Sequence, residues 1–385
     1  MTGNKKNPFA ASVGSLPVYF GGKHNTDIIE EILESLNNPN KPSSTSLIRG
    51  TSGIGKTTLL NQLRDRCIEQ GGWIVVSVSS SETLLDEILQ QAYRNAQEFV
   101  AQEGKVRFSG ASAEVSANIP KILQSAAPQV KIKVSWDAVS QPQYTWRTKM
   151  SLLLDELSAY NIGLMLLVDE ATKSDQMNEF MSSYVQLIYE GRLISLVLAG
   201  LPVCVDEIIN EKNLTFARRC CQIILSCFTE ADTRTALSET AKYSDKHFSE
   251  DALSVASAET HGFPYMMQLV GHYSFDAAGE NDVIDLAAVR KGIQRSKQIF
   301  RKTIVRSEVL SLNDNELNFL LTMASSKSKE VKPKEINDQN QWQMKTYSMI
   351  RQSLIQRGMI EKSAYGTVEF AMPELKEYLL DEYLQ

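Results

Sequence analysis

Eight consecutive residues, Gly50 to Thr57, combine glycines with a lysine and a threonine at a spacing that suits phosphate groups. The run fits the pattern G-x-x-x-x-G-K-[ST]. Glycines can adopt backbone angles closed to other residues and let main-chain N–H groups approach phosphate oxygens. Lys56 can bridge the β- and γ-phosphates, and the hydroxyl of Thr57 can ligate Mg²⁺. The predicted phosphate-binding residues of this P-loop are Gly50, Thr51, Ser52, Gly53, Ile54, Gly55, Lys56, Thr57 and Thr58.

The flanking segments have the form that such a loop requires. Residues 46–49 favour a short strand before it, and residues 58–63 begin an amphipathic helix after it. The positive end of that helix would point at the phosphates. A surface turn is the alternative for a glycine-rich stretch, and the fixed positions between strand and helix disfavour it.

A second motif supplies two carboxylates. The apolar run from Leu164 to Val168 is typical of a strand buried on both faces, and Asp169 and Glu170 follow it. Ligands of open α/β sheets bind at such strand ends. We therefore expect Asp169 to hold Mg²⁺, and Glu170 to polarise the water that attacks ATP. A core strand that ends in two acids without function is the alternative.

Composition sets the broad class of the protein. The chain has 385 residues, which predicts two or three domains, and its 43% hydrophobic and 22% charged residues are ordinary for a globular protein. No stretch is apolar for the length of a membrane span, and no secretory signal is visible, so we expect no membrane partner. Five cysteines without C-x-x-C spacing predict neither a disulfide framework nor a zinc site, which fits the cytoplasm. Cys221 and Cys227 are expected to fill an apolar strand.

The order of elements predicts an α/β fold with a doubly wound parallel sheet, because apolar strand patterns alternate with helical ones. Further strands are expected at residues 73–78, 193–199 and 222–226, and helices at 25–36, 82–101 and 145–160.

Residues 104–143 depart from this alternation. Val106–Phe108 and Val130–Val134 have the period of strands, which predicts a hairpin-like insertion. An interaction surface and a solvated loop are equally compatible with it.

After Phe228 the strands are expected to stop. Residues 230–304 have helical patterns. From residue 307, three predicted helices (314–323, 334–337 and 343–357) precede a hairpin of residues 359–362 and 367–370. That order is typical of a winged helix.

These motifs together resemble AAA+ ATPases of the origin-recognition and replication-initiator type over the whole chain. The domain order, Gly200-Leu201-Pro202 after the fourth strand, His261 to Tyr265, and Pro17 to Lys23 carry the resemblance. It implies a P-loop core at 1–228, a helical lid at 229–306 and a winged helix at 307–385. The P-loop ATPases called STAND have the same parts.

The resemblance also implies roles for single residues. Arg218 and Arg219 lie where the family carries an arginine finger, which would act on the ATP of a neighbouring subunit in a homo-oligomer. A surface arginine pair is the alternative. Pro264 belongs to a lid element close to the nucleotide. Ala199-Gly200-Leu201 offers no polar sensor, and Tyr265 stands where many relatives have arginine. Slow hydrolysis, or a switch set by nucleotide occupancy, is therefore expected.

The predicted winged helix offers a candidate DNA surface. Lys345, Tyr347, Ser348 and Arg351 lie on the third helix, and Lys362 lies on the wing.

Charge limits the extent of such a surface. Residues 327–362 contain eight basic and four acidic side chains, net +4, whereas residues 310–385 contain nine and eleven, net −2. The formal charge of the whole chain is −6, which does not favour a protein that coats DNA. Packing, or binding of a protein partner, is the alternative use of the winged helix.

Two function classes follow. The first is a Mg²⁺-dependent ATPase whose nucleotide state controls assembly on double-stranded DNA, in replication, transposition or the maintenance of mobile elements. The second is a STAND-like signalling or defence ATPase whose winged helix binds a protein partner. Salt-dependent DNA binding that needs ATP would separate them.

Overall fold

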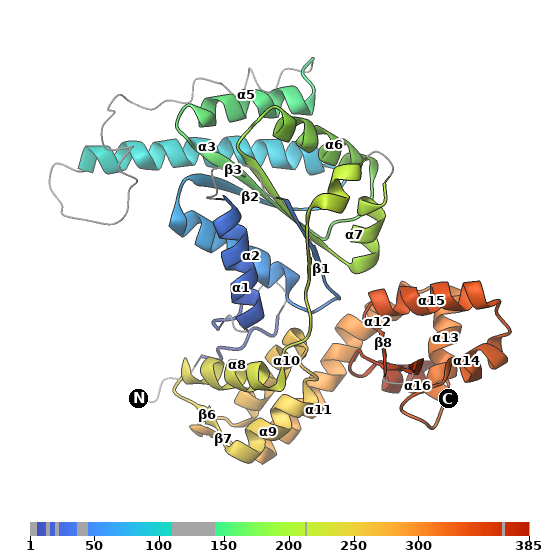
Figure 1. Ribbon diagram of the computed structural model, residues 1–385. Coiled ribbons are helices and arrows are strands. Elements are labelled where there is room, and N and C mark those ends of the chain that lie inside the picture. Colours follow the sequence, from blue (N-terminus) through green and yellow to red (C-terminus); the bar gives the residue numbers. More distant parts are fainter. Residues whose placement is uncertain are drawn as a thin grey trace.

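A five-stranded parallel sheet lies between two layers of helices (Figure 1). The computed structural model describes residues 6–12, 16–19, 23–36, 45–109, 143–211, 214–363 and 366–384. The strand order is β2-β3-β4-β1-β5. The strands are β1 (Thr45–Arg49), β2 (Trp73–Ser79), β3 (Gly163–Asp169), β4 (Ile194–Gly200) and β5 (Cys221–Ile224). The α/β class and the predicted strands of the core are thus confirmed.

Helices cover both faces of the sheet because alternate strand residues point to opposite sides. In β3, Leu164, Leu166 and Val168 pack on one side, and Met165 and Leu167 on the other. The first side is covered by α3 (Leu84–Ser109), α5 (Trp146–Ser158), α6 (Asp175–Tyr189) and α7 (Pro202–Ile209). The second is covered by α1 (Lys23–Leu36) and α2 (Lys56–Gln70).

The register of the sheet brings the two motifs to one edge. Arg49, the last residue of β1, pairs with Gly200 at the end of β4. Val168 of β3 pairs with Leu198 of β4, so β3 ends at the same edge. The P-loop and the Asp169–Glu170 pair therefore leave the sheet side by side.

The predicted insertion is wrong in its first half. Val106–Phe108 lies in the last turns of α3, not in a strand. Three alternating residues are too short a pattern to outweigh a helix that is already formed, and α3 continues past Gly104 to Ser109. The second half, Val130–Val134, lies outside the described residues.

The two cysteines expected in an apolar strand are both exposed. Cys221 does begin β5, but β5 is an edge strand with one side open. Cys227 follows the end of β5.

A helical region follows the sheet. It comprises α8 (Glu230–Lys242), α9 (Glu250–Glu259), α10 (Pro264–Ala277) and α11 (Leu286–Phe300). Strands do not stop entirely at Phe228, because β6 (His247–Phe248) and β7 (Val283–Ile284) form a short parallel pair.

The C-terminal unit contains the predicted three helices and hairpin. Its elements are α13 (Asp314–Ser325), α14 (Pro333–Asn340), α15 (Met344–Gln356), β8 (Ile360–Lys362), β9 (Val368–Phe370) and an additional helix, α16 (Leu375–Tyr383). The strands of the hairpin pair antiparallel, and Val331 bridges to Val368 beside them. Asn313 caps α13, in a capping box with Glu316.

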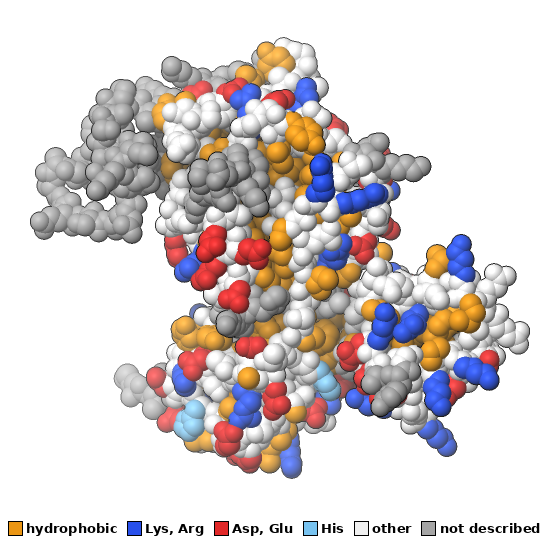
Figure 2. Space-filling view, in the orientation of Figure 1, with side chains coloured by type: hydrophobic (Ala, Val, Ile, Leu, Met, Phe, Trp, Pro, Cys, Tyr) orange, Lys and Arg blue, Asp and Glu red, His pale blue; other side chains and the backbone are white. Residues whose placement is uncertain are grey.

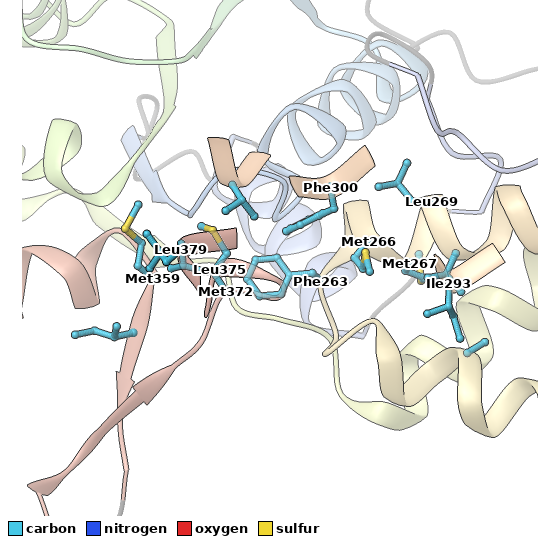
Figure 3. Close-up of a cluster of buried hydrophobic side chains, with 14 of the residues drawn as sticks. Phe263, Met266, Met267, Leu269, Ile293, Phe300, Met359, Met372, Leu375 and Leu379 are labelled. Carbon is cyan, nitrogen blue, oxygen red and sulfur yellow. The ribbon is translucent and has the colours of Figure 1, made fainter. Parts of the chain in front are cut away.

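One continuous helical segment joins the two regions. It runs from α11 through a π-helical turn, η2 (Arg301–Val305), into α12 (Arg306–Leu310). Figure 3 shows side chains of the helical region, such as Phe263 and Phe300, near Met372 and Leu375 of the C-terminal unit. All belong to one buried cluster. The boundary expected at 306/307 thus falls inside a helix with a shared core.

The N-terminal segment, residues 6–12, is anchored on α10. The Phe9 side chain is only 4% exposed and lies edge-on to the rings of Phe248 and Phe275. Gly271 leaves the space that the Phe9 ring occupies. The Ala10 N–H donates to Gln268 Oε1 at 2.8 Å.

Within the described part of the chain, no helix is both long enough and apolar enough to span a bilayer.

Candidate nucleotide site

A cavity of ≈ 870 Å³ opens where the P-loop, the Asp169–Glu170 pair, the N-terminal residues and the helical region meet. This volume falls in the range of small-molecule sites. The P-loop wall includes Gly53, Lys56, Thr57 and Thr58, and the opposite walls include Pro17, Tyr19, Phe228, Pro264, Tyr265, Gln268, Thr303 and Ile304.

The P-loop has the backbone that its glycines were expected to permit. Gly53 and Gly55 have φ of 77° and 98°, in the left-handed region. Helix α2 begins directly after Gly55. In the part of the chain that the structure describes, the N–H groups of Lys56, Thr57 and Thr58 have no protein acceptor. They form, with the positive end of the helix, a place for an anion.

The Lys56 ammonium group lies over the P-loop. Its Nζ donates to the carbonyl oxygens of Gly50 at 2.9 Å and Thr51 at 3.0 Å. Burial lowers the pKa of Lys56, while the carboxylates of Asp169 and Glu308 favour its charged form. A phosphate group would supply a stronger acceptor than either carbonyl.

Thr57 and Asp169 form the pair expected at a metal. Thr57 Oγ1 donates to Asp169 Oδ2 at 2.5 Å, and the Glu170 N–H donates to Asp169 Oδ1 at 2.8 Å. A hydroxyl and a carboxylate are hard oxygen donors, which suit Mg²⁺. Among the described residues, no group of three or more His, Cys, Asp or Glu side chains is arranged to hold a metal ion. The pair therefore fits a Mg²⁺ that takes its other ligands from phosphates and water.

Glu170 has an unusual backbone for its side chain. Its φ is 50°, in the left-handed region, and the residue is exposed on the cavity wall. Such strain in non-glycine residues gathers at functional sites. Glu170 follows Asp169 in the chain and presents an exposed side chain on the cavity wall, where it could orient a water molecule.

The fourth strand has no side chain where a polar sensor would lie. A Cβ at Gly200 would come within 2.8 Å of the Ala171 carbonyl oxygen and 3.1 Å of Val205 Cγ2. Packing at this strand end thus requires glycine. Tyr265 meets the P-loop by its backbone instead, with its N–H donating to the Gly53 carbonyl at 3.2 Å.

Two residues from the far end of the chain also touch the P-loop. Glu308, which is 7% exposed, accepts a hydrogen bond from the Ser52 hydroxyl across 256 residues of sequence. Gly358 lies against Thr51 so closely that any side chain at 358 would overlap it. Sequence reasoning missed both, because no local pattern marks a contact of this separation.

Arg218 and Arg219 do not reach the P-loop of their own chain. Both are exposed in η1 (Thr215–Arg219), before β5. Cys221 of β5 pairs with Ser46, and the P-loop starts after Arg49, about 13 Å further along the sheet at 3.3 Å per residue. Arg219 lines a separate cavity of ≈ 390 Å³ at that edge.

The predicted DNA-facing residues are divided by burial. Lys345, Ser348 and Lys362 are exposed, and Arg351 is half-buried. Tyr347 was wrongly included, because it is 3% exposed and its ring stacks on Phe319 with centroids 5.6 Å apart. The helical period places it on the core side of α15.

Comparisons with known proteins bear on the fold. A family model described as "Domain of unknown function (DUF8462)" matches residues 302–379, and the model "Mitochondrial ribosomal death-associated protein 3" matches residues 23–105. No curated protein matches the chain. A solved Walker-type ATPase of Pyrococcus abyssi is similar with a TM-score of 0.64 at 14% identity, over 92% of this chain and 94% of that one. The chain shares the fold of this Walker-type ATPase.

Two further similar structures have lower scores than this one. Cdc6p of Pyrobaculum aerophilum has a TM-score of 0.48 at 16% identity, over 97% of this chain and 98% of that one. The RuvB Holliday junction branch migration motor of Thermotoga maritima has a TM-score of 0.46 at 14% identity, also over 97% and 98%.

Proposed function

We propose that this protein binds ATP with Mg²⁺ and hydrolyses it slowly. The bound nucleotide, ATP or ADP, controls the assembly of the protein on DNA. The observation that carries the proposal is the cavity in which the P-loop amides, Lys56, the Thr57–Asp169 pair and Glu170 meet at one end. That end offers amides, an ammonium group and metal ligands to a charged ligand, so the triphosphate lies there and the base lies toward Tyr19 and Gln268.

Each side chain then has one task in hydrolysis. Lys56 leaves the carbonyls of Gly50 and Thr51 for the β- and γ-phosphate oxygens. Thr57 and Asp169 would hold Mg²⁺, which neutralises charge on those oxygens when bound. Glu170 accepts a proton from the attacking water molecule. The oxygen of this water bonds to the γ-phosphorus, while the bond between the γ-phosphorus and the bridging oxygen of ADP breaks.

The missing sensors support slow turnover. Gly200 contributes no polar group, and Tyr265 cannot carry the charge of an arginine. Without a polar side chain at position 200 and an arginine at position 265, less of the negative charge that develops in the transition state is stabilised, so hydrolysis is slower. Turnover of tens per second by the purified protein would contradict this part of the proposal.

The position of Arg218 and Arg219 supports action between subunits. They are exposed and distant from their own P-loop, so a neighbouring copy is the site on which they could act. We infer a homo-oligomer on this ground. We also infer a P-loop core at 1–228, a helical lid at 229–306 and a winged helix at 307–385.

The exposed basic residues of the C-terminal unit support a DNA surface. Figure 2 shows Lys and Arg side chains spread over the visible face of this unit. Lys345 and Ser348 on α15, with Lys362 at the end of β8, could contact phosphates.

One observation favours a protein partner instead. Met344 and Met349 on α15 are 66% and 65% exposed. Exposed methionines suit adaptable protein interfaces. The second candidate function is therefore a STAND-like signalling ATPase whose C-terminal unit binds a protein.

Light scattering after size exclusion tests the proposal. The protein is run with ATP, ADP or no nucleotide, each with and without duplex DNA, beside Lys56→Ala as the control that no longer holds the triphosphate. We expect the mass to rise with ATP, and rise further with DNA, in the wild type alone. A mass that ignores nucleotide would refute the assembly switch, and a mass that responds to ATP but ignores DNA would favour the second candidate.

A further inference from the structure

The connecting helical segment is strongly basic. Between Leu286 and Ser307 the chain has seven basic residues and no acidic one. The seven are Arg290, Lys291, Arg295, Lys297, Arg301, Lys302 and Arg306. Charge of one sign over this length is an electrostatic footprint for a polyanion.

Two of these residues are paired within the protein. Lys297 contacts Glu259 and Glu374, and Arg301 contacts Glu374 and Asp381 of α16. These pairs attach α16 to the connecting segment. Lys297 and Arg301 thus have a structural role, whereas the other five basic residues do not take part in these pairs.

Four of the others form a stripe on the solvent side: Lys291, Arg295, Lys302 and Arg306. Their spacings are four, seven and four residues, which keeps them on one face of a helix. All four are exposed, and among the described residues none of them makes an ion pair. Arg295 bonds only weakly to Gln298, at 3.3 Å, and its guanidinium carbon lies 5.9 Å from the ring centroid of Tyr273.

The opposite face of the same helix is fixed in the core. Val289, Ile293 and Phe300 are all buried there. Because this apolar face is already covered, the segment cannot lie in a membrane surface as an amphipathic helix does. The exposed positions between the stripe residues are polar, including Gln294, Gln298 and Thr303.

The dimensions of the stripe fit a nucleic-acid backbone. From Lys291 to Arg306 a helix rises about 22 Å at 1.5 Å per residue, which equals six or seven base pairs of about 3.4 Å each. Basic residues four apart are about 6 Å apart along the axis. Glutamine amides between them can also donate to phosphates.

We propose that the stripe is a second DNA-contacting surface, outside the C-terminal unit, that binds the phosphate backbone without reading sequence. This rests on the proposed function, in that the protein binds DNA. The stripe ends where the helix enters the C-terminal unit. A duplex held by α15 and β8 is thus offered a second contact on a rigidly connected element.

The test is the salt dependence of binding to a labelled duplex of about 30 base pairs, measured by fluorescence anisotropy. The stripe variant carries Lys291→Gln, Arg295→Gln, Lys302→Gln and Arg306→Gln. A matched control removes four exposed basic residues elsewhere, Arg66→Gln, Arg94→Gln, Arg147→Gln and Lys242→Gln. A third variant, Lys345→Gln with Lys362→Gln, alters the C-terminal unit. ATP binding by each variant checks that it is folded.

We expect the slope of log K against log salt to become shallower by about 0.9 for each phosphate that the variant no longer neutralises, or by about 2 to 4 in the stripe variant. The matched control should keep the wild-type slope. The C-terminal variant should have a shallower slope of its own, independently of the stripe.

Each other outcome has a definite meaning. If the wild type binds and the stripe variant keeps its slope, the second surface is refuted while the proposed function stands. If the slopes of the stripe variant and the matched control fall equally, only net charge matters and the surface is again refuted. If the wild type binds no DNA even at low salt, both fail. Stripe-dependent binding of polyglutamate in preference to DNA would assign the surface to an acidic protein.

Discussion

Replacing Gly271 by alanine should loosen the attachment of the N-terminal segment to α10. The new methyl group would overlap the ring of Phe9, which is buried against Phe248 and Phe275. Either Phe9 leaves its place or the helices move apart. The hydrogen bond between Ala10 and Gln268 lies next to Phe9 and would be strained in both cases.

The magnitude can be worked from these contacts. Releasing a buried phenylalanine costs about 1.5–3 kcal/mol, and overpacking costs about 1–3 kcal/mol. Alanine is better than glycine inside a helix by about 1 kcal/mol, which offsets part of that cost. Subtracting that offset, we expect a net destabilisation of up to about 2 kcal/mol for Gly271→Ala.

A second background reverses the sign. In Phe9→Ala the overlapping ring is gone, so Gly271→Ala should stabilise α10 by about 1 kcal/mol through helix propensity alone. The coupling between the two substitutions is then about 1–3 kcal/mol, which is the cost of the overlap itself. Phe9→Ala by itself should cost about 3 kcal/mol, toward the lower end for a large core residue.

Hydrogen exchange of the α10 and α11 amides is the suitable assay, because it reports the free energy of local opening in a protein of several units. ATP affinity measured alongside should fall in Gly271→Ala, since Pro17 and Tyr19 follow the N-terminal segment into the cavity wall. Equal effects of Gly271→Ala in both backgrounds would refute the packing argument.

Three further predictions concern the site and its core. Glu170→Gln should keep ATP binding and slow single-turnover phosphate release by about 10²–10⁴-fold; an unchanged rate would remove Glu170 from proton transfer. The double variant Arg218→Ala, Arg219→Ala should be inactive alone but regain ATPase activity when mixed with Glu170→Gln, which keeps ATP binding and supplies intact arginines; no recovery would argue against action between subunits. Burial raises the pKa of the Cys67 thiol to about 12. Above about pH 9 the thiol therefore loses its proton in the unfolded chain but keeps it in the folded one. The free energy of unfolding from denaturant titrations should then fall by up to about 1.4 kcal/mol per pH unit. Cys67→Ala should lack this pH dependence.

The sheet and the phosphate end of the site were accessible to sequence reasoning because their signals are local. The glycine-and-lysine loop and the apolar run before Asp169 each occupy fewer than ten residues. Parallel strands then require that Thr57 and Asp169 meet, and the structure has them in contact. Thr57 and Asp169 are far apart in sequence, but parallel strands have their carboxyl ends at the same edge of the sheet, so the contact could be predicted.

The wrong predictions concern short patterns that fit two structures equally well. The missed contacts join residues so far apart in sequence that no local pattern indicates them. Val106–Phe108 alternates over too few residues to exclude a helix. Tyr347 has a polar end that suits a DNA contact, yet its ring fills the core beside Phe319. Glu308 has nothing in its neighbourhood that indicates a partner in the P-loop.

The contacts of Glu308 and Gly358 with the P-loop have a practical meaning for anyone who would shorten this protein. A fragment that ends after the sheet would expose Ser52 and Thr51 to water and remove a buried negative charge from beside Lys56. Nucleotide constants measured on such a fragment would describe a differently built pocket, so only a chain that keeps its C-terminal unit can serve as the reference for its biochemistry.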